Sequence, residues 1–97
     1  MIVLNVTYRC RPGMRAEFLG RIYAEGIDVS SRAEDGNIKY DYYFPENDAD
    51  GLLLVEKWRD GDALSAHALT PHFKRLTEFK PLYVLETIVE RYETERK

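Results

Sequence analysis

Cysteine, proline and glycine are scarce in this sequence, which has one cysteine, four prolines and six glycines among 97 residues. Because the single thiol, Cys10, cannot form an internal disulfide, we expect a reducing compartment and a cytoplasmic protein. Acidic residues outnumber basic ones, and the formal net charge of −3 argues against a nucleic-acid surface, which needs a basic stripe. No apolar run approaches the roughly 20 residues that cross a membrane. Neither nucleic acid nor a membrane is therefore an expected partner.

Apolar and aromatic residues are abundant by comparison. Hydrophobic residues make up 44% of the chain and aromatic residues 12%, and seven of the aromatic residues are tyrosines. Tyrosine tolerates half-burial, which favours clefts and interfaces over a purely aliphatic core. A chain of this length can support one core, so we expect residues 1–97 to form a single domain.

The spacing of apolar residues predicts the order of strands and helices. Strands are expected at residues 2–8, 38–44, 52–58 and 85–92. Helices are expected at residues 14–31 and, after N-caps at Asp60 and Thr70, in two segments that end near residue 80. The resulting order β-α-β-β-α-β predicts a ferredoxin-like α+β sandwich: a four-stranded antiparallel sheet with the helices on one face.

Both faces of the predicted sheet carry apolar side chains. In the third strand, Leu52 and Leu54 point to one face and Leu53 and Val55 to the other. The predicted helices can cover only one face, so the other needs a different cover. A second copy of the chain is the simplest one, and we expect a homodimer that packs sheet against sheet. The alternative is a curled monomer with a solvated, tyrosine-rich face.

The segment 52–73 carries the most distinctive motifs. It reads LLLVEKWRDGDALSAHALTPHF, with E-x-W at the end of a strand and H-x-x-T-P-H-F across two helix starts. With the RPG of residues 11–13, the E-D-G-N-x-x-Y-D of residues 34–41 and the Pro-Leu of residues 81–82, this order resembles the antibiotic biosynthesis monooxygenase family. The resemblance implies ferredoxin-like domains that dimerise through their sheets into an α+β barrel.

That family is functionally broad, and its branches can be compared with individual residues. The heme-degrading branch resembles this chain at Asn5, but it has a tryptophan at the position of His67 and a histidine at about the position of Thr77. Without that histidine the iron has no proximal ligand, which argues against heme degradation. The resemblance therefore favours a cofactor-independent monooxygenase that oxidises a small aromatic quinol, phenol or anthrone-like substrate with dioxygen.

Two other functions remain open on the same scaffold. One is an isomerase of a small phosphorylated dicarbonyl, which would need a cationic group at the pocket, and Arg9, Arg75 or Lys74 would be suitable. The other is a non-catalytic protein that binds small molecules.

Oxygenation without a cofactor requires a bound ring, a proton acceptor and a stabilised oxyanion. His67 is the best proton acceptor, because imidazole titrates nearest neutral pH; alternatively it is a satisfied core histidine. Asn5 is polar within an apolar strand and is a candidate to bind a substrate oxygen, or it pairs with a buried neighbour. Glu56 would orient a histidine or act as a base, unless it makes a structural ion pair.

Aromatic residues are the candidates for binding a flat substrate. Tyr40, Tyr42, Trp58 and Phe73 could stack on a ring, and His72 could line the same pocket, although each of them is also typical of an ordinary core. Tyr40 and Tyr42 share the helix-facing side of their strand, whereas Tyr43 faces the other way. His67 and His72 are five residues apart, which does not suit ligands on one helical face, so we expect no metal site and no cofactor.

Overall fold

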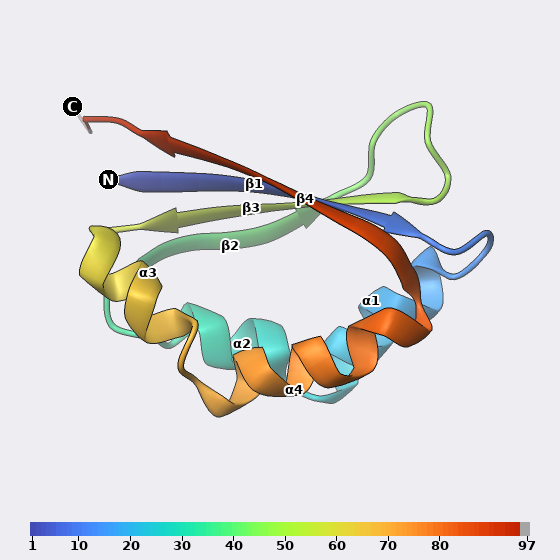
Figure 1. The fold of residues 1–97 in the computed structure, drawn as a ribbon, viewed down its shortest axis with the longest axis horizontal. Helices are drawn as coiled ribbons and strands as arrows, with labels where there is room; N and C mark the ends of the chain where they lie inside the picture. Colours follow the sequence, from blue (N-terminus) through green and yellow to red (C-terminus); the bar gives the residue numbers. More distant parts are fainter. Residues whose placement is uncertain (96–97) are drawn as a thin grey trace.

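The computed structural model describes residues 1–95, and its four strands form one antiparallel sheet in the order β2-β3-β1-β4. All helices lie on one face of this sheet (Figure 1). The strands are β1 (Ile2–Cys10), β2 (Asn37–Tyr43), β3 (Gly51–Trp58) and β4 (Val84–Glu93). The helices are α1 (Arg15–Ala24), α2 (Ile27–Arg32), α3 (Gly61–His67), α4 (Pro71–Phe79) and the short 3-10 helix η1 (Lys80–Leu82). The predicted ferredoxin-like α+β fold is confirmed.

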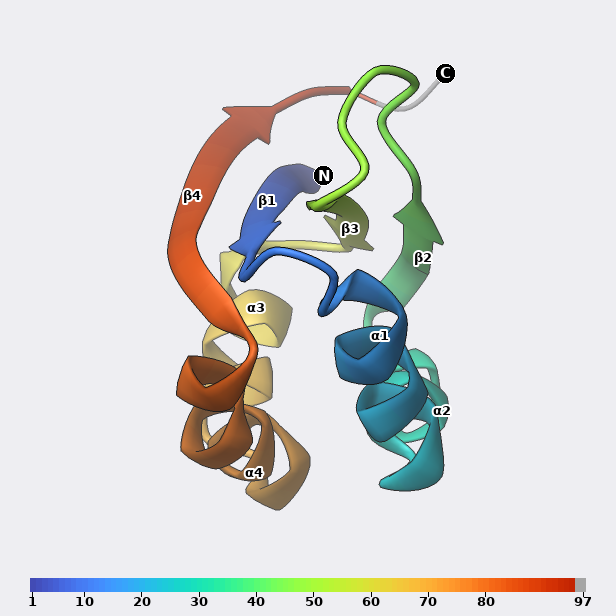
Figure 2. The ribbon, with the colours of Figure 1, turned by 90° about the vertical axis from the view of Figure 1, so that its right-hand side faces the viewer.

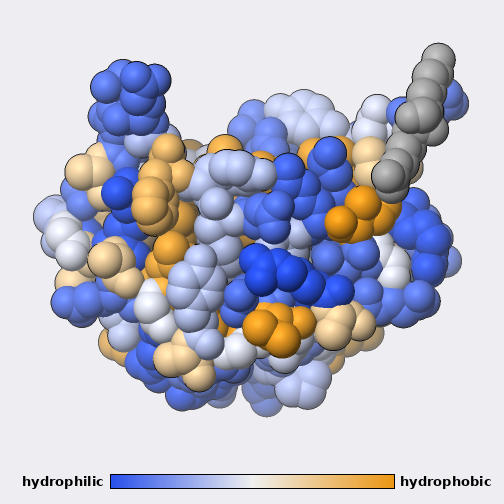
Figure 3. All heavy atoms as spheres, turned by 180° about the vertical axis from the view of Figure 1, so that it is seen from behind, coloured by the Kyte–Doolittle hydropathy of each residue, from blue (hydrophilic) through white to orange (hydrophobic). Residues whose placement is uncertain are grey.

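The helices form two groups beneath the sheet. Figure 2 shows α3 and α4 below β4, and α1 and α2 below β2. None of the helices within residues 1–95 has the length and apolar character needed to cross a bilayer. Figure 3 views the molecule from behind, where hydrophilic and hydrophobic side chains alternate over short distances.

The first helical segment is broken where the sequence predicted one continuous helix. Helix α1 ends at Ala24 and α2 begins at Ile27, because Gly26 adopts a left-handed conformation with φ of 67°. Glycine has no Cβ and enters this region without steric strain. The prediction of a single helix over residues 14–31 was therefore wrong.

Both predicted caps of the second helical segment are present. The Asp60 side chain accepts a hydrogen bond from the Ala63 backbone N–H at 2.9 Å, and Thr70 Oγ1 accepts one from Phe73 N–H at 3.2 Å. These caps satisfy backbone donors that a helix start leaves free. Only three residues separate the end of α3 from the start of α4, so His67 lies on one helix and His72 on the next.

The two faces of the sheet differ in burial. The even-numbered residues of β1 are buried beneath the helices, and the odd-numbered ones are only partly covered. The register extends this alternation to β3 and β4. We call the side without helices the bare face; apolar residues near its centre are Val3, Leu53, Val55 and Ile88, and charged residues around them include Lys39, Asp41, Lys57, Glu86 and Glu90. As predicted, β3 carries apolar residues on both faces.

Candidate active site

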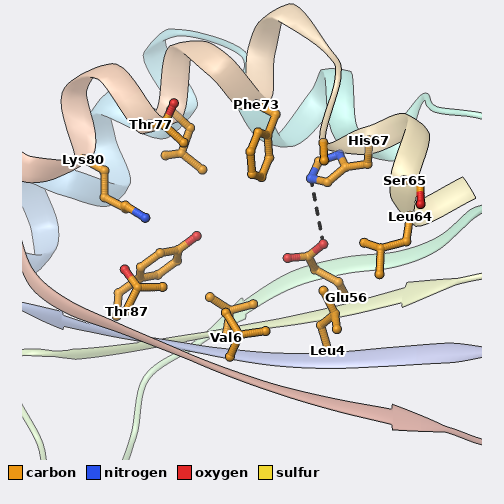
Figure 4. Close-up of a pocket in the computed structure, with 14 residues that line it drawn as sticks. Leu4, Val6, Glu56, Leu64, Ser65, His67, Phe73, Thr77, Lys80 and Thr87 are labelled. Atoms are coloured by element: carbon orange, nitrogen blue, oxygen red, sulfur yellow. Dashed lines mark ion pairs between the residues drawn. The ribbon is translucent and has the colours of Figure 1, made fainter. Parts of the chain in front are cut away.

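A cavity of about 360 Å³ lies between the helix-covered face of the sheet and helices α3 and α4 (Figure 4). This volume is at the lower end of the range for small-molecule pockets, about 300–1,000 Å³, and suits a ligand of one or two rings. Most of the wall is apolar. Leu4, Val6 and Val89 line it from the sheet, and Leu64, Phe73 and Leu76 line it from the helices.

Glu56 and His67 face each other at one end of this cavity (Figure 4). Glu56 is on the helix-covered side of β3, and His67 is the last residue of α3; they are 5% and 3% exposed. His67 Nε2 is 3.9 Å from Glu56 Oε1. This separation is too long for a hydrogen bond in the free protein, and catalytic contacts of this kind often shorten only when substrate binds.

The protonation of Glu56 is set by its surroundings. Burial is the main influence, and it raises the pKa of this carboxyl above its ordinary value because a buried carboxylate loses its hydration. The Trp58 indole N–H donates a hydrogen bond to Glu56 Oε1 at 3.0 Å and, with the His67 ring, lowers the pKa in part. Glu56 therefore keeps its proton to a higher pH than an exposed glutamate does.

A second acidic residue, Glu34, orients the histidines. Its Oε2 is 2.5 Å from Nδ1 of His67 and 2.8 Å from Nε2 of His72. A carboxylate can only accept hydrogen bonds, so both ring nitrogens act as N–H donors. In neutral His67 the proton is therefore on Nδ1, and Nε2 presents its lone pair towards Glu56. This is the tautomer that a general base at the cavity needs.

The sequence analysis did not identify Glu34 as a site residue. Glu34 precedes the turn into β2 and lies 33 positions before His67. Its only signal was its place in the E-D-G-N segment that carries the family resemblance. Glu34 does not line the cavity and contacts it only through His67.

Glu34 and the two histidines also have the spacing of a candidate metal site. Glu34, His67 and His72 each offer a ligand atom within 4.8 Å of the other two. The spacing of five residues does not suit ligands on one helical face, but His67 and His72 lie on different helices, and the fold brings them together. However, Glu34 Oε2 already accepts hydrogen bonds from both rings, which leaves this cluster satisfied without a cation.

The predicted aromatic residues surround His67, but most of them do not line the cavity. The ring centroids of Trp58, Phe73 and Tyr40 lie 4.7, 5.2 and 5.9 Å from that of His67. Only Phe73 among them lines the cavity. Tyr40, Tyr42, Trp58 and His72 are not part of its wall, so the structure does not place them where a bound ring would stack. Trp58 and His72 instead hold Glu56 and Glu34 by hydrogen bonds.

Asn5 is not part of this site. It pairs with Val55 and Glu90 in the sheet, and its odd position in β1 directs its side chain to the bare face. Because successive side chains of a strand point to opposite faces, Asn5 is separated from His67 by the sheet itself. The prediction that both residues act on one substrate within a protomer is not supported by this geometry.

Comparison with known proteins identifies the family. The sequence profile described as "Antibiotic biosynthesis monooxygenase" matches residues 1–78. The chain belongs to this family. A Bacillus subtilis (strain 168) protein named "Putative monooxygenase YcnE" is 36% identical over 74 residues, which are 76% of each chain.

Solved structures share the fold over almost the whole chain. The crystal structure of PA3566 from Pseudomonas aeruginosa is 28% identical, with a TM-score of 0.84 over 98% of this chain and 94% of that one. The structure of Rv0793 from Mycobacterium tuberculosis is 23% identical, with a TM-score of 0.86 over 99% and 96%. The match to the antibiotic biosynthesis monooxygenase family supports a general monooxygenase-like function for this chain.

Proposed function

We propose that the protein is a cofactor-independent monooxygenase that oxidises a small aromatic quinol, phenol or anthrone-like substrate with dioxygen. The observation that carries this proposal is the hydrogen bond from His67 Nδ1–H to Glu34, which leaves Nε2 as a base at the end of an apolar cavity. A positioned base of this kind removes a proton from a bound hydroxyaromatic ring. Phe73 and the aliphatic wall would exclude water around that ring.

The reaction needs no external reductant, because the substrate supplies the electrons. His67 Nε2 accepts the substrate proton, and the resulting anion transfers one electron to dioxygen. The substrate radical and superoxide then form a carbon–oxygen bond, and the imidazolium returns its proton to the peroxide. Loss of water breaks the O–O bond and leaves a carbonyl. One oxygen atom stays in the product and the other leaves as water with two hydrogens of the substrate.

Oxygen consumption tests this proposal directly. Protein treated with a chelator should consume dioxygen with at least one member of a panel of anthrones, naphthols and quinols. His67→Gln removes the base while keeping a polar side chain, and it should lower kcat by about 10² or more. No uptake with any substrate, or undiminished uptake by His67→Gln, would overturn the proposal.

The isomerase alternative receives no support from the three cations predicted for it. Arg9 contacts Glu86 at 3.8 Å and Arg75 contacts Glu25 at 2.6 Å, and neither lines the cavity. Lys74 is also outside its wall. None of the three cations predicted for a phosphate group lies where a substrate beside His67 would reach it.

We also propose that the protein is a homodimer through the bare face. The apolar side chains of Val3, Leu53, Val55 and Ile88 lie on three neighbouring strands of this face, with Asn5 and Thr7 of β1 between those of β3 and β4. An apolar surface of this kind is typically covered by a partner. A sheet-to-sheet dimer would also bury Asn5, so that any role of Asn5 would lie at the interface.

A further inference from the structure

The end of the cavity opposite His67 holds a lysine. Lys80 follows the last residue of α4, is half-buried, and its side chain points into the cavity (Figure 4). Within residues 1–95, no carboxylate lies within 4.0 Å of its ammonium group. Burial alone lowers the pKa of Lys80, and no neighbouring acidic group offsets that effect. A half-buried cation without a counter-charge is costly unless a ligand supplies one.

Two hydroxyl groups accompany Lys80. Tyr8 and Thr87 both line the cavity, and neither hydroxyl makes a hydrogen bond within the described part of the chain. The Lys80 ammonium lies 6.0 Å from the centroid of the Tyr8 ring, which is the outer limit of a cation–π contact. Thr77 differs, because its hydroxyl already donates to the Lys74 carbonyl at 2.7 Å. Lys80 and Tyr8 are therefore available donors at this end.

The end of the cavity that holds Glu56 and His67 disfavours an anionic ligand group. Glu56 would repel an anionic group whenever its carboxyl is ionised, and it accepts a hydrogen bond from a hydroxyl in that state. A ligand with an anionic group and a hydroxyl on an apolar ring would thus bind in one orientation. Its hydroxyl would face Glu56 and His67, and its anionic group would face Lys80.

We propose that Lys80 forms an anion subsite that pairs with a carboxylate of the substrate, so that the protein acts on hydroxyaromatic acids. This inference deepens the proposed function and rests on it for the hydroxyl end. The Tyr8 hydroxyl donates a second hydrogen bond to the same carboxylate. A charge-assisted pair of this kind selects strongly against a neutral group of the same shape.

Equilibrium binding under anaerobic conditions tests the subsite separately from turnover. The probes are 4-hydroxybenzoate and 6-hydroxy-2-naphthoate, each compared with its carboxamide. The wild-type protein should bind at least one acid roughly 10-fold or more tightly than its amide, as expected for a hydrogen bond to a charged group. Lys80→Met should abolish this preference, Lys80→Arg should retain part of it, and Lys74→Met, on α4 but outside the cavity, should leave it unchanged.

Several outcomes would overturn the subsite. These are equal binding of acid and amide by the wild-type protein, a preference that survives Lys80→Met, and tighter binding of 4-hydroxyphenyl phosphate than of either acid. The proposed function can fail independently. If the acids bind through Lys80 but no oxygen is consumed, the subsite stands and the oxygenase proposal falls. If only neutral quinols bind and are oxidised, the oxygenase proposal stands and the Lys80 subsite falls.

Discussion

Glu34 Oε2 lies 2.5 Å from Nδ1 of His67, although the two residues are 33 positions apart in the sequence. This contact fixes the tautomer of a buried histidine and turns its Nε2 towards the cavity and Glu56. It assigns distinct roles to two acidic residues. Glu34 positions the base, and Glu56 lines the cavity where the substrate would bind.

Glu34→Gln should lower kcat for oxygen consumption by about 10² and leave KM nearly unchanged. The amide can still accept one hydrogen bond, but it removes the negative charge that stabilises the imidazolium form of His67. Steady-state oxygen uptake measures both constants. KM is expected to be insensitive because Glu34 does not line the cavity.

Asp35→Asn is the matched control for that variant. Asp35 is adjacent and acidic, but it is exposed and contacts Arg59 at 3.3 Å, so its loss should not alter kcat. A kcat for Glu34→Gln within twofold of wild type, or an equal loss in Asp35→Asn, would contradict the positioning role.

Trp58→Phe should move the acid limb of the pH profile of kcat/KM to higher pH. The indole N–H of Trp58 lowers the pKa of Glu56, whereas burial raises it. Without that donor the effect of burial is less opposed, so Glu56 ionises at a higher pH. Phe79→Leu is the control, because Phe79 is also a buried aromatic residue but has no side-chain donor for a hydrogen bond to Glu56. An equal shift of the profile in Phe79→Leu, or no shift in Trp58→Phe, would contradict the effect of the Trp58 hydrogen bond on the pKa of Glu56.

Glu25→Gln should reduce thermal stability at pH 7 and have little effect near pH 2. Hydrogen bonds from Arg75 and Arg21 lower the pKa of Glu25 from 4.5 to about 2. A lowered carboxyl pKa stabilises the folded state above pH 4.5, and this stabilisation is lost as pH falls towards 2. The drop in Tm at pH 7 should be modest, because exposed ion pairs contribute little.

The control for Glu25 is Glu78→Gln, which weakens a longer contact of 3.8 Å to the same Arg75. Its Tm should change less at every pH. A destabilisation by Glu25→Gln that is as large at pH 2 as at pH 7 would show that charge is not its cause.

Sedimentation at micromolar concentration should give a particle of twice the 11.3 kDa chain mass. Val55→Lys places a charge opposite Asn5 on the bare face and should produce monomers. Val29→Lys is a matched control, because Val29 is 65% exposed on α2, away from the bare face. A wild-type particle of single-chain mass, or equal dissociation by both variants, would rule out this interface.

The sequence predicted the strands and the caps well, because these depend on local patterns. Short runs of apolar and β-branched residues predicted β1 and β3, and Asp60 and Thr70 start helices by accepting nearby backbone N–H groups. The break at Gly26 was missed, since glycine is also tolerated within helices at a cost of about 1 kcal/mol. Local propensity does not determine which of these two conformations a glycine adopts.

The site was less predictable, because it is assembled from distant segments. His67 and Glu56 were identified from the sequence as titratable groups, His67 near the end of a helix and Glu56 near the end of a strand. Asn5 was grouped with His67, although its odd position set it apart from Leu4 and Val6 on the buried face. Apart from the E-D-G-N segment that contains Glu34, neither Glu34 nor Lys80 carries a local signal, and the packing of α3 and α4 against the sheet brings both to the site.

A crystal structure with a bound hydroxyaromatic ligand, obtained without oxygen, tests the central claim most directly. The account predicts that the ring lies in the cavity beside Phe73, with its hydroxyl within hydrogen-bonding distance of His67 Nε2 or the Glu56 carboxylate. A ring bound elsewhere, or a hydroxyl turned away from both groups, would contradict it.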